Sequence, residues 1–171
     1  MNEIIMRKAL HSDINQIIEI CSNSYLDTYH LIYTREEINS VISEFYNENR
    51  IKKEIINNNR EWQGYYVAET NKRVVGCIGG GMISNKDAEI FVLYLDLKYK
   101  NRGIGTMLIR FLTTIQKETY NAKKQYVSVT QSNLSAIRFY EKNGFNIIGI
   151  SENIFLEKTQ EKNFRMVRQI V

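Results

Sequence analysis

Leu93-Tyr-Leu-Asp-Leu-Lys-Tyr-Lys-Asn-Arg-Gly-Ile-Gly-Thr-Met-Leu-Ile-Arg-Phe-Leu112 decides the fold, because an apolar strand passes through a basic, glycine-containing turn directly into an amphipathic helix. The start of a helix leaves four backbone N–H groups without partners and carries a partial positive charge. Two glycines, Gly103 and Gly105, allow a bulky anion to approach these groups. The stretch therefore predicts a site for a phosphorylated cofactor, although a tight turn whose glycines only relieve strain explains an isolated Gly-x-Gly equally well.

The neighbouring residues argue against two other phosphate-binding loops. A P-loop ends in Gly-Lys-Ser/Thr, but Thr106 and Met107 follow Gly105. A dinucleotide fingerprint needs a third small residue where Leu108 stands, and a carboxylate at the end of a second strand about 20 residues later. Residues 98–124 contain seven Lys and Arg residues against one Glu, a larger positive charge than the net +4 of the whole chain. This charge favours an anion site over a plain turn.

Length and composition indicate one globular domain over residues 1–171, with 43% hydrophobic and 25% charged residues. No apolar run approaches the ~18 residues that cross a bilayer, and the N-terminus does not resemble a secretory signal. We therefore expect no membrane association and a cytoplasmic location. Cys21 and Cys77 are expected to be buried free thiols. With His11 and His30 as the only histidines and no Cys pair at ligand spacing, we expect no metal site.

The pI near 9.0 raises nucleic-acid binding as an alternative. The basic residues gather around one turn, however, and are not interleaved with aromatic residues on which bases would stack. We therefore expect no nucleic-acid partner, and steep salt dependence of DNA binding without competition by the cofactor would contradict this.

The hydrophobic periodicity changes along the chain from helical to strand-like. Strands are predicted at 3–8, 65–70, 73–84, 88–97, 125–130, 145–151 and 164–170, and helices from about residue 12, from the capping box Thr34-Arg-Glu-Glu37, after Asn47, after the glycine turn and at 132–143. Gly79, Gly80 and Gly81 are too permissive for a regular strand. We expect a bulge or a close approach of two backbones there.

A second motif is Asn133-Leu-Ser-Ala-Ile-Arg-Phe-Tyr-Glu-Lys-Asn-Gly-Phe145. On a helix, Asn133 and Tyr140 fall on one stripe about two turns apart, so that an amide could hold a cofactor while a phenol takes part in chemistry. Alternatively, Tyr140 is only a core residue and Gly144 only ends the helix. The motif alone does not separate the two interpretations.

Together, Leu93-Tyr-Leu95, Arg102-Gly-Ile-Gly105 and Asn133-x-x-Ala136-Ile-x-Phe139-Tyr140-x-x-x-Gly144-Phe145 resemble the two acetyl-CoA motifs of the GNAT superfamily of N-acetyltransferases. The order of elements agrees along essentially the whole chain. The resemblance implies an α/β (α+β) fold with a central, mixed, largely antiparallel twisted sheet of about six or seven strands, flanked by about four or five helices. It also implies acetyl-CoA as co-substrate, with no covalent acetyl-enzyme.

The same resemblance assigns roles to single residues. The backbone of Leu93 to Leu95 would bind pantetheine, N–H groups from Asn101 to Thr106 would hold the pyrophosphate, and Asn133 would contact the cofactor arm. Lys100 stands where the family more often has Gln or Arg, and Leu97 where proline is frequent. The predicted cofactor-binding residues are Leu93, Tyr94, Leu95, Lys100, Asn101, Arg102, Gly103, Ile104, Gly105, Thr106, Asn133 and Lys142.

Two residues are candidates for the chemistry of acetyl transfer. An amine with a pKa of ~10 is protonated at neutral pH, so a base must accept its proton before the nitrogen attacks the thioester. Glu89 lies six residues before Leu95 on the same predicted strand, and the two-residue period places both on one face. Alternatively, Glu89 is only a strand residue whose side chain faces solvent. Tyr140 is the candidate acid for the leaving thiolate. The resemblance also implies that a backbone N–H near Leu95 stabilises the oxyanion.

The acceptor is predicted from the acidic segment 26–48, which carries five carboxylates against Arg35. In this superfamily the first two helices border the acceptor cleft, so these carboxylates would suit a cationic amine, although a charged run is more often a solvated face. The stretches 24–29 and 45–47 also resemble bacterial spermine/spermidine N-acetyltransferases, which makes a polyamine the first candidate acceptor. The alternatives are a protein N-terminus or lysine, and a CoA-binding regulatory module without catalysis. An exposed last strand could pair in a homodimer.

Overall fold

The computed structural model describes residues 3–152 and 161–170, and the following elements lie within them. They are β1 (Ile5–Lys8), α1 (Ile14–Tyr29), α2 (Arg35–Phe45), α3 (Glu48–Ile56), β2 (Tyr65–Thr70), β3 (Arg73–Met82), β4 (Asp87–Leu95), α4 (Ile104–Tyr120), β5 (Lys124–Thr130), α5 (Leu134–Lys142), β6 (Asn146–Glu152) and β7 (Lys162–Gln169). Local signals set several boundaries. Thr34 accepts a hydrogen bond from the N–H of Glu37, while the Glu37 carboxylate accepts one from the Thr34 N–H, so the predicted capping box is confirmed.

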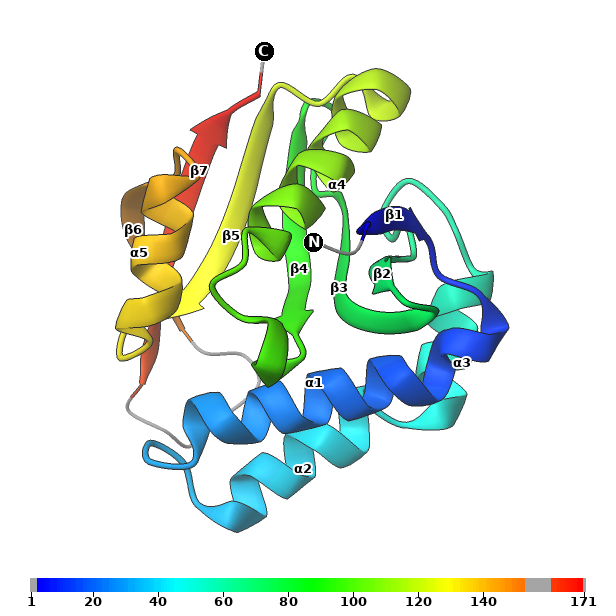
Figure 1. Ribbon diagram of the computed structural model, residues 1–171. Helices are drawn as coiled ribbons and strands as arrows, with labels where there is room; N and C mark the ends of the chain where they lie inside the picture. Colours follow the sequence, from blue (N-terminus) through cyan, green and yellow to red (C-terminus); the bar gives the residue numbers. More distant parts are fainter. Residues whose placement is uncertain (1–2, 153–160, 171) are drawn as a thin grey trace.

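The strands form one sheet in the order β1-β2-β3-β4-β5-β7-β6 (Figure 1). Every neighbouring pair is antiparallel except β4 and β5, which run parallel, so the predicted mixed and largely antiparallel sheet is confirmed. The pairing of β4 with β5 ends at Ile90 and Val127. Beyond that point β4 pairs with β3 alone as far as Leu95, so the two parallel strands separate and one edge of β4 opens.

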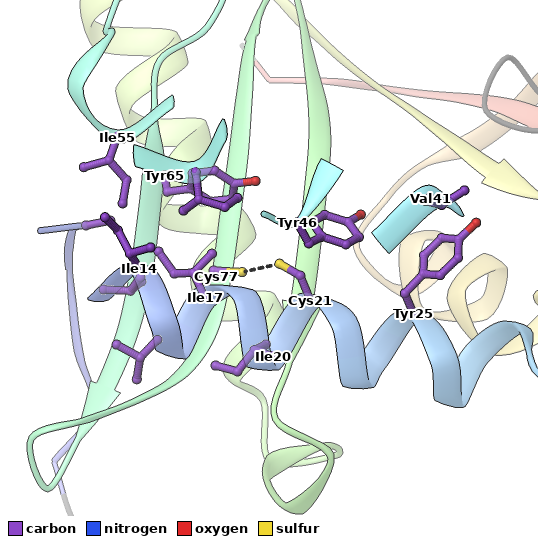
Figure 2. Close-up of a cluster of buried hydrophobic side chains, with 14 of the residues drawn as sticks. Ile14, Ile17, Ile20, Cys21, Tyr25, Val41, Tyr46, Ile55, Tyr65 and Cys77 are labelled. Atoms are coloured by element: carbon purple, nitrogen blue, oxygen red, sulfur yellow. Dashed lines mark hydrogen bonds between the residues drawn. The ribbon is translucent and has the colours of Figure 1, made fainter. Parts of the chain in front are cut away.

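Helices cover both faces of the sheet. Residues of α1, α2 and α3 form one buried cluster with β2, β3 and β4, and residues of α4 and α5 form a second cluster on the opposite face. Figure 2 shows part of the first cluster, in which Cys21 of α1 faces Cys77 of β3 with Tyr46 and Tyr65 close by. Both cysteines are free and buried, as predicted, and their sulfur atoms lie 3.6 Å apart.

A bulge interrupts β4 opposite the three consecutive glycines. Gly79 pairs with Val92 and Gly80 pairs with Ile90, which leaves Phe91 as an extra residue. The backbone of residue 61 also crosses β3 so closely that a Cβ on Gly81 would lie 1.8 Å from the carbonyl oxygen of Glu61. The predicted bulge and the predicted close backbone approach are therefore both confirmed.

Gly81→Ala is expected to lower the free energy of unfolding by about 3 kcal/mol, because its Cβ would meet backbone that cannot move aside without breaking the contact. Gly149→Ala, in exposed strand β6 with nothing within 4 Å of its Cβ, is the matched control and should change stability by less than about 0.5 kcal/mol. Urea unfolding followed by circular dichroism measures both. Equal midpoints for the two variants would contradict the close crossing.

The last strand was predicted to be the exposed one, and this is wrong. β7 lies between β5 and β6, so β6 forms that edge of the sheet. Ile147, Ile148 and Ile150 of β6 are exposed. A homodimer thus stays a prediction, and β6 rather than β7 is the strand through which this edge could pair. Among the described residues, none of the helices has the length and apolar content to cross a bilayer.

Candidate active site

The predicted phosphate turn has the geometry of an anion site. Gly103 precedes α4 with φ +80°, in the left-handed region that favours glycine, and Asn101 also has a positive φ. Because α4 begins immediately afterwards, the N–H groups of Ile104, Gly105 and Thr106 belong to its first turn and have no intrahelical partners. Such groups can bind an anion, and the helix dipole adds partial positive charge.

The two glycines of the turn have different roles. A Cβ on Gly103 would meet nothing within 4 Å, so its conformation and not its size matters. A Cβ on Gly105 would lie 3.0 Å from the ring of Phe139, so this residue lets α5 pack closely against the start of α4. The side chain of Leu95 also lies beside Gly105. The structure therefore brings the end of β4, the phosphate turn and α5 together.

The basic side chains of the turn are engaged at the surface. Lys100 Nζ lies 2.8 Å from Asp27 Oδ2 of α1, and the Arg102 guanidinium stacks on Tyr99 at 5.1 Å. Lys100, its partner Asp27 and Arg102 are exposed, while Tyr99 is half-buried, so a phosphate can compete for the two cations. Asp27 is one of the carboxylates that the sequence assigned to the acceptor, yet it faces the phosphate turn.

The open edge of β4 and α5 hold the other predicted cofactor residues. Leu93, Tyr94 and Leu95 occupy the part of β4 that does not pair with β5. The backbone groups there that face away from β3, apart from the Leu95 carbonyl, which Ser24 binds, are available to an extended ligand. Asn133 caps α5 by accepting a hydrogen bond from the Ala136 N–H at 3.1 Å, which leaves its amide NH2 as a donor. Lys142 lies in the last turn of α5. An open strand edge, a helix start and flanking cations fit a phosphorylated cofactor with an extended amide arm.

Ser24 was missed by sequence reasoning. Its hydroxyl donates a 2.6 Å hydrogen bond to the Leu95 carbonyl and ties α1 to the end of β4. Ser24 and Leu95 are 71 residues apart, so no local signal marks the contact.

Tyr140 is buried between aromatic rings on the α4 and α5 face. Its ring contacts Phe139 and Phe145 in edge-on geometry. Burial, with a smaller contribution from Tyr29, raises the pKa of the Tyr140 hydroxyl above its usual value. The hydroxyl therefore stays protonated and can act as a donor across the neutral and mildly alkaline range.

A pocket of about 460 Å³ lies between the first three helices and the sheet, within the usual size range of small-molecule sites. Phenol rings dominate its walls: Tyr25, Tyr29 and Tyr33 follow one another along α1 and beyond its end with centroid distances of 4.5 and 5.2 Å. Tyr46 donates a hydrogen bond to Tyr94 at 3.1 Å across the pocket. We call it the tyrosine pocket; it is lined by Tyr25, Tyr29, Tyr33, Val41, Phe45, Tyr46, Arg50, Glu54, Tyr65, Glu89, Ile90, Phe91, Tyr94, Ser128, Thr130, Ser151, Glu152, Asn163 and Arg165.

Glu89 lines this pocket, but it does not lie on the face of Leu95, so that prediction is wrong. The bulge at Phe91 shifts the alternation, so Leu93 and Leu95 pack toward α4 while Glu89 shares the pocket with Tyr94. Glu89 is also not solvent-facing, because its side chain is only 13% exposed and both of its oxygens accept hydrogen bonds from Arg165. The Nη2 to Oε2 distance of that ion pair is 2.7 Å.

The acidic segment 26–48 does not supply the charges of the pocket. None of its carboxylates is among the described residues that line it: Asp27 faces the phosphate turn and Glu37 caps α2. In the part of the chain that the structure describes, the pocket carboxylates are Glu54, Glu89 and Glu152. Sequence reasoning missed Glu54, although its position four residues after Arg50 on a helix signals the ion pair that the two form at 2.8 Å.

No group of three His, Cys, Asp or Glu side chains suited to a metal ion occurs in the part of the chain that the structure describes. The site thus consists of a phosphate turn, an open strand edge and an aromatic pocket, and β4 borders all three.

Comparisons with known proteins agree with this geometry. The family model of the acetyltransferase (GNAT) family matches residues 24–145. A spermidine N(1)-acetyltransferase from Thermoplasma acidophilum is 31% identical over 146 residues, which cover 84% of this chain and 89% of the relative. An N-alpha-acetyltransferase from Sulfolobus acidocaldarius is 24% identical over 164 residues, or 89% and 85% of the two chains.

Among solved structures, the PaiA N-acetyltransferase from Thermoplasma acidophilum, in complex with coenzyme A, superposes with a TM-score of 0.83 at 27% identity. The superposition covers 98% of this chain and 99% of that one. The resemblance carried by the two sequence motifs is confirmed in the matched family model, the relatives and the fold. The chain therefore belongs to the acetyltransferase (GNAT) family of acetyl-CoA-dependent N-acetyltransferases.

Proposed function

We propose that the protein acetylates a primary amine of a polyamine such as spermidine, which binds in the tyrosine pocket. The observation that carries the proposal is the position of β4. Tyr94 faces the pocket while Leu93 and Leu95 turn toward the cofactor side, so an amine in the pocket lies across the strand from the predicted pantetheine edge. The relative of 31% identity, a spermidine N(1)-acetyltransferase, supports a polyamine as the acceptor.

The proposed chemistry uses two side chains and one backbone group. Acetyl-CoA supplies the acetyl group as a thioester. Glu89 accepts the proton of the ammonium form, directly or through a water, so that the nitrogen can attack the acetyl carbon. A backbone N–H at the open end of β4 stabilises the oxygen as it gains charge. The Tyr140 hydroxyl donates a proton to the leaving sulfur as the carbon–sulfur bond breaks. The nitrogen then gives up its extra proton, which restores the Tyr140 hydroxyl, and the products are an amide and a thiol.

Release of free thiol from acetyl-CoA, measured against polyamines, aminoglycosides, amino acids and peptides with a free N-terminus, tests the proposal. Turnover is expected with polyamines first. Turnover with peptides alone would replace the polyamine by a protein N-terminus, which the Sulfolobus acidocaldarius relative favours. Binding of acetyl-CoA without thiol release for any amine would favour a regulatory module that binds the cofactor without catalysis.

Lys100→Gln combined with Arg102→Gln is expected to raise the KM for acetyl-CoA about tenfold and to leave kcat within about twofold. The two cations flank the predicted phosphate site and take no part in the transfer itself. The effect should shrink at high salt, because it is electrostatic. Lys52→Gln with Lys53→Gln, an equal loss of charge on exposed positions of α3, is the control and should leave the KM unchanged. An equal KM for both double variants would remove the turn from the cofactor site.

A further inference from the structure

The tyrosine pocket contains charged side chains, but its inner carboxylates are neutralised. Of the described residues that line it, five are charged: Arg50, Glu54, Glu89, Glu152 and Arg165. Glu89 is bound through both oxygens by Arg165, and Glu54 is bound by Arg50. Glu152 is 78% exposed and contacts Lys162, so it belongs to the rim. The inner part of the pocket therefore combines aromatic walls with a formal charge of zero.

Arg165 is held where it neutralises Glu89. It stands on β7, stacks on the ring of Tyr126 at 4.8 Å, and also donates a hydrogen bond to Ser128 at 3.0 Å. Its side chain is 24% exposed and that of Glu89 is 13% exposed, so water screens this pair less than a surface pair. A cationic substrate group near Glu89 consequently meets one negative and one positive charge at nearly the same distance.

This arrangement limits how many ammonium groups the pocket attracts. The faces of the phenol rings can hold one ammonium group through cation–π contact. Each oxygen of Glu89 keeps a lone pair that can accept the proton of this ammonium. Among the described residues, a second or third ammonium would find no uncompensated carboxylate at depth, and it would be repelled by Arg50 and Arg165. On the basis of the proposed function, we propose that Arg165 is a specificity-determining residue that restricts the tyrosine pocket to a single ammonium group. A polyamine then enters by one end, and its other ammonium groups stay outside the inner pocket.

The test compares acceptors of similar chain chemistry and increasing charge: butylamine, 1,4-diaminobutane, spermidine and spermine, at fixed ionic strength. For the wild type, kcat/KM should change little with the number of charges. In Arg165→Gln, the ratio of kcat/KM for spermine to that for butylamine should rise about tenfold, because Glu89 becomes an uncompensated carboxylate. The ratio is taken within one variant, so any change in the strength of Glu89 as a base cancels.

Three further variants make the result specific. Arg165→Lys keeps the positive charge and should keep the wild-type ratio. Arg50→Gln leaves the Glu54 carboxylate without its cation, in a pair that is more exposed than that of Glu89, and should shift the ratio in the same direction. This variant replaces Arg165→Gln if that variant does not fold. Arg73→Gln uncovers Asp96, which does not line the tyrosine pocket, and therefore controls for the change in net charge. Its ratio should equal that of the wild type.

Titration calorimetry of the same four amines against the CoA complex provides a second readout that does not need turnover. A charge-dependent gain in affinity in Arg165→Gln, with no acetylation of any amine, would uphold the inference and remove the proposed function. A uniform change for all four amines in both kcat/KM and affinity would overturn the inference while leaving the acetyltransferase in place. Absence of amine binding in every variant would overturn it as well.

Discussion

Tyr140→Phe is expected to lower kcat about 100-fold and to leave the KM for acetyl-CoA within about twofold, since loss of a general acid typically costs a factor of 10² or more. The substitution removes only the hydroxyl, while the ring keeps its edge-on contacts with Phe139 and Phe145. No hydrogen bond to this hydroxyl is formed within the described residues, so its loss leaves no protein partner unsatisfied. Stability should therefore stay within about 1 kcal/mol of the wild type.

The control is Tyr66→Phe, which removes a hydroxyl from another buried tyrosine of the same cluster. It should retain full kcat. Because burial raises the pKa of Tyr140, its hydroxyl remains protonated as the pH rises past the usual value of a tyrosine, so the wild-type rate should not fall on this account up to about pH 10. Undiminished turnover in Tyr140→Phe would show that the sulfur leaves without this proton donor.

The parts of the fold that sequence reasoning predicted depend on contacts between near neighbours in the chain. The Thr34 and Glu37 capping box, the Asn47 cap and the left-handed Gly103 are each defined within about four residues. The sheet order could be taken only from the family resemblance. β6 and not β7 forms the edge because of strand pairing across the sheet, which no local pattern shows. For that reason the exposed strand was predicted wrongly.

The orientation of Glu89 shows why a periodic rule failed at the site. The two-residue period holds for a regular strand, but Phe91 is inserted where β3 carries its three glycines. The sequence indicated an irregularity in β3 without showing which strand would carry the extra residue. The three glycines predicted a close approach of two backbones, but the segment that approaches, at residue 61, lies about 20 residues away and no local pattern identifies it.

The charges of the pocket were misassigned for a related reason. Glu36 and Glu44 lie on α2 away from its buried positions Ile38 and Val41, so they are exposed. A charge count over a helix does not separate its two faces. The pair that does lie in the pocket joins Glu89 to Arg165 across 76 residues, and only the folded sheet brings them together.

Glu89→Gln is expected to lower kcat/KM by a factor of about 10² to 10³, through two effects that can be separated. The amide cannot accept the ammonium proton, which lowers kcat. The substitution also leaves Arg165 without its carboxylate, so an uncompensated cation in the pocket repels the amine and raises its KM. The single variant therefore does not distinguish a general base from a residue that only neutralises Arg165.

The double variant Glu89→Gln with Arg165→Gln separates the two roles, because it restores a neutral pair of similar size. If Glu89 is the base, the KM for the amine should return close to the wild-type value while kcat stays low. The rate of the double variant should then rise with pH as the fraction of free amine rises, since no side chain removes the proton. Recovery of wild-type kcat would instead assign Glu89 solely to charge balance, and the proton would have to leave through another group or through water.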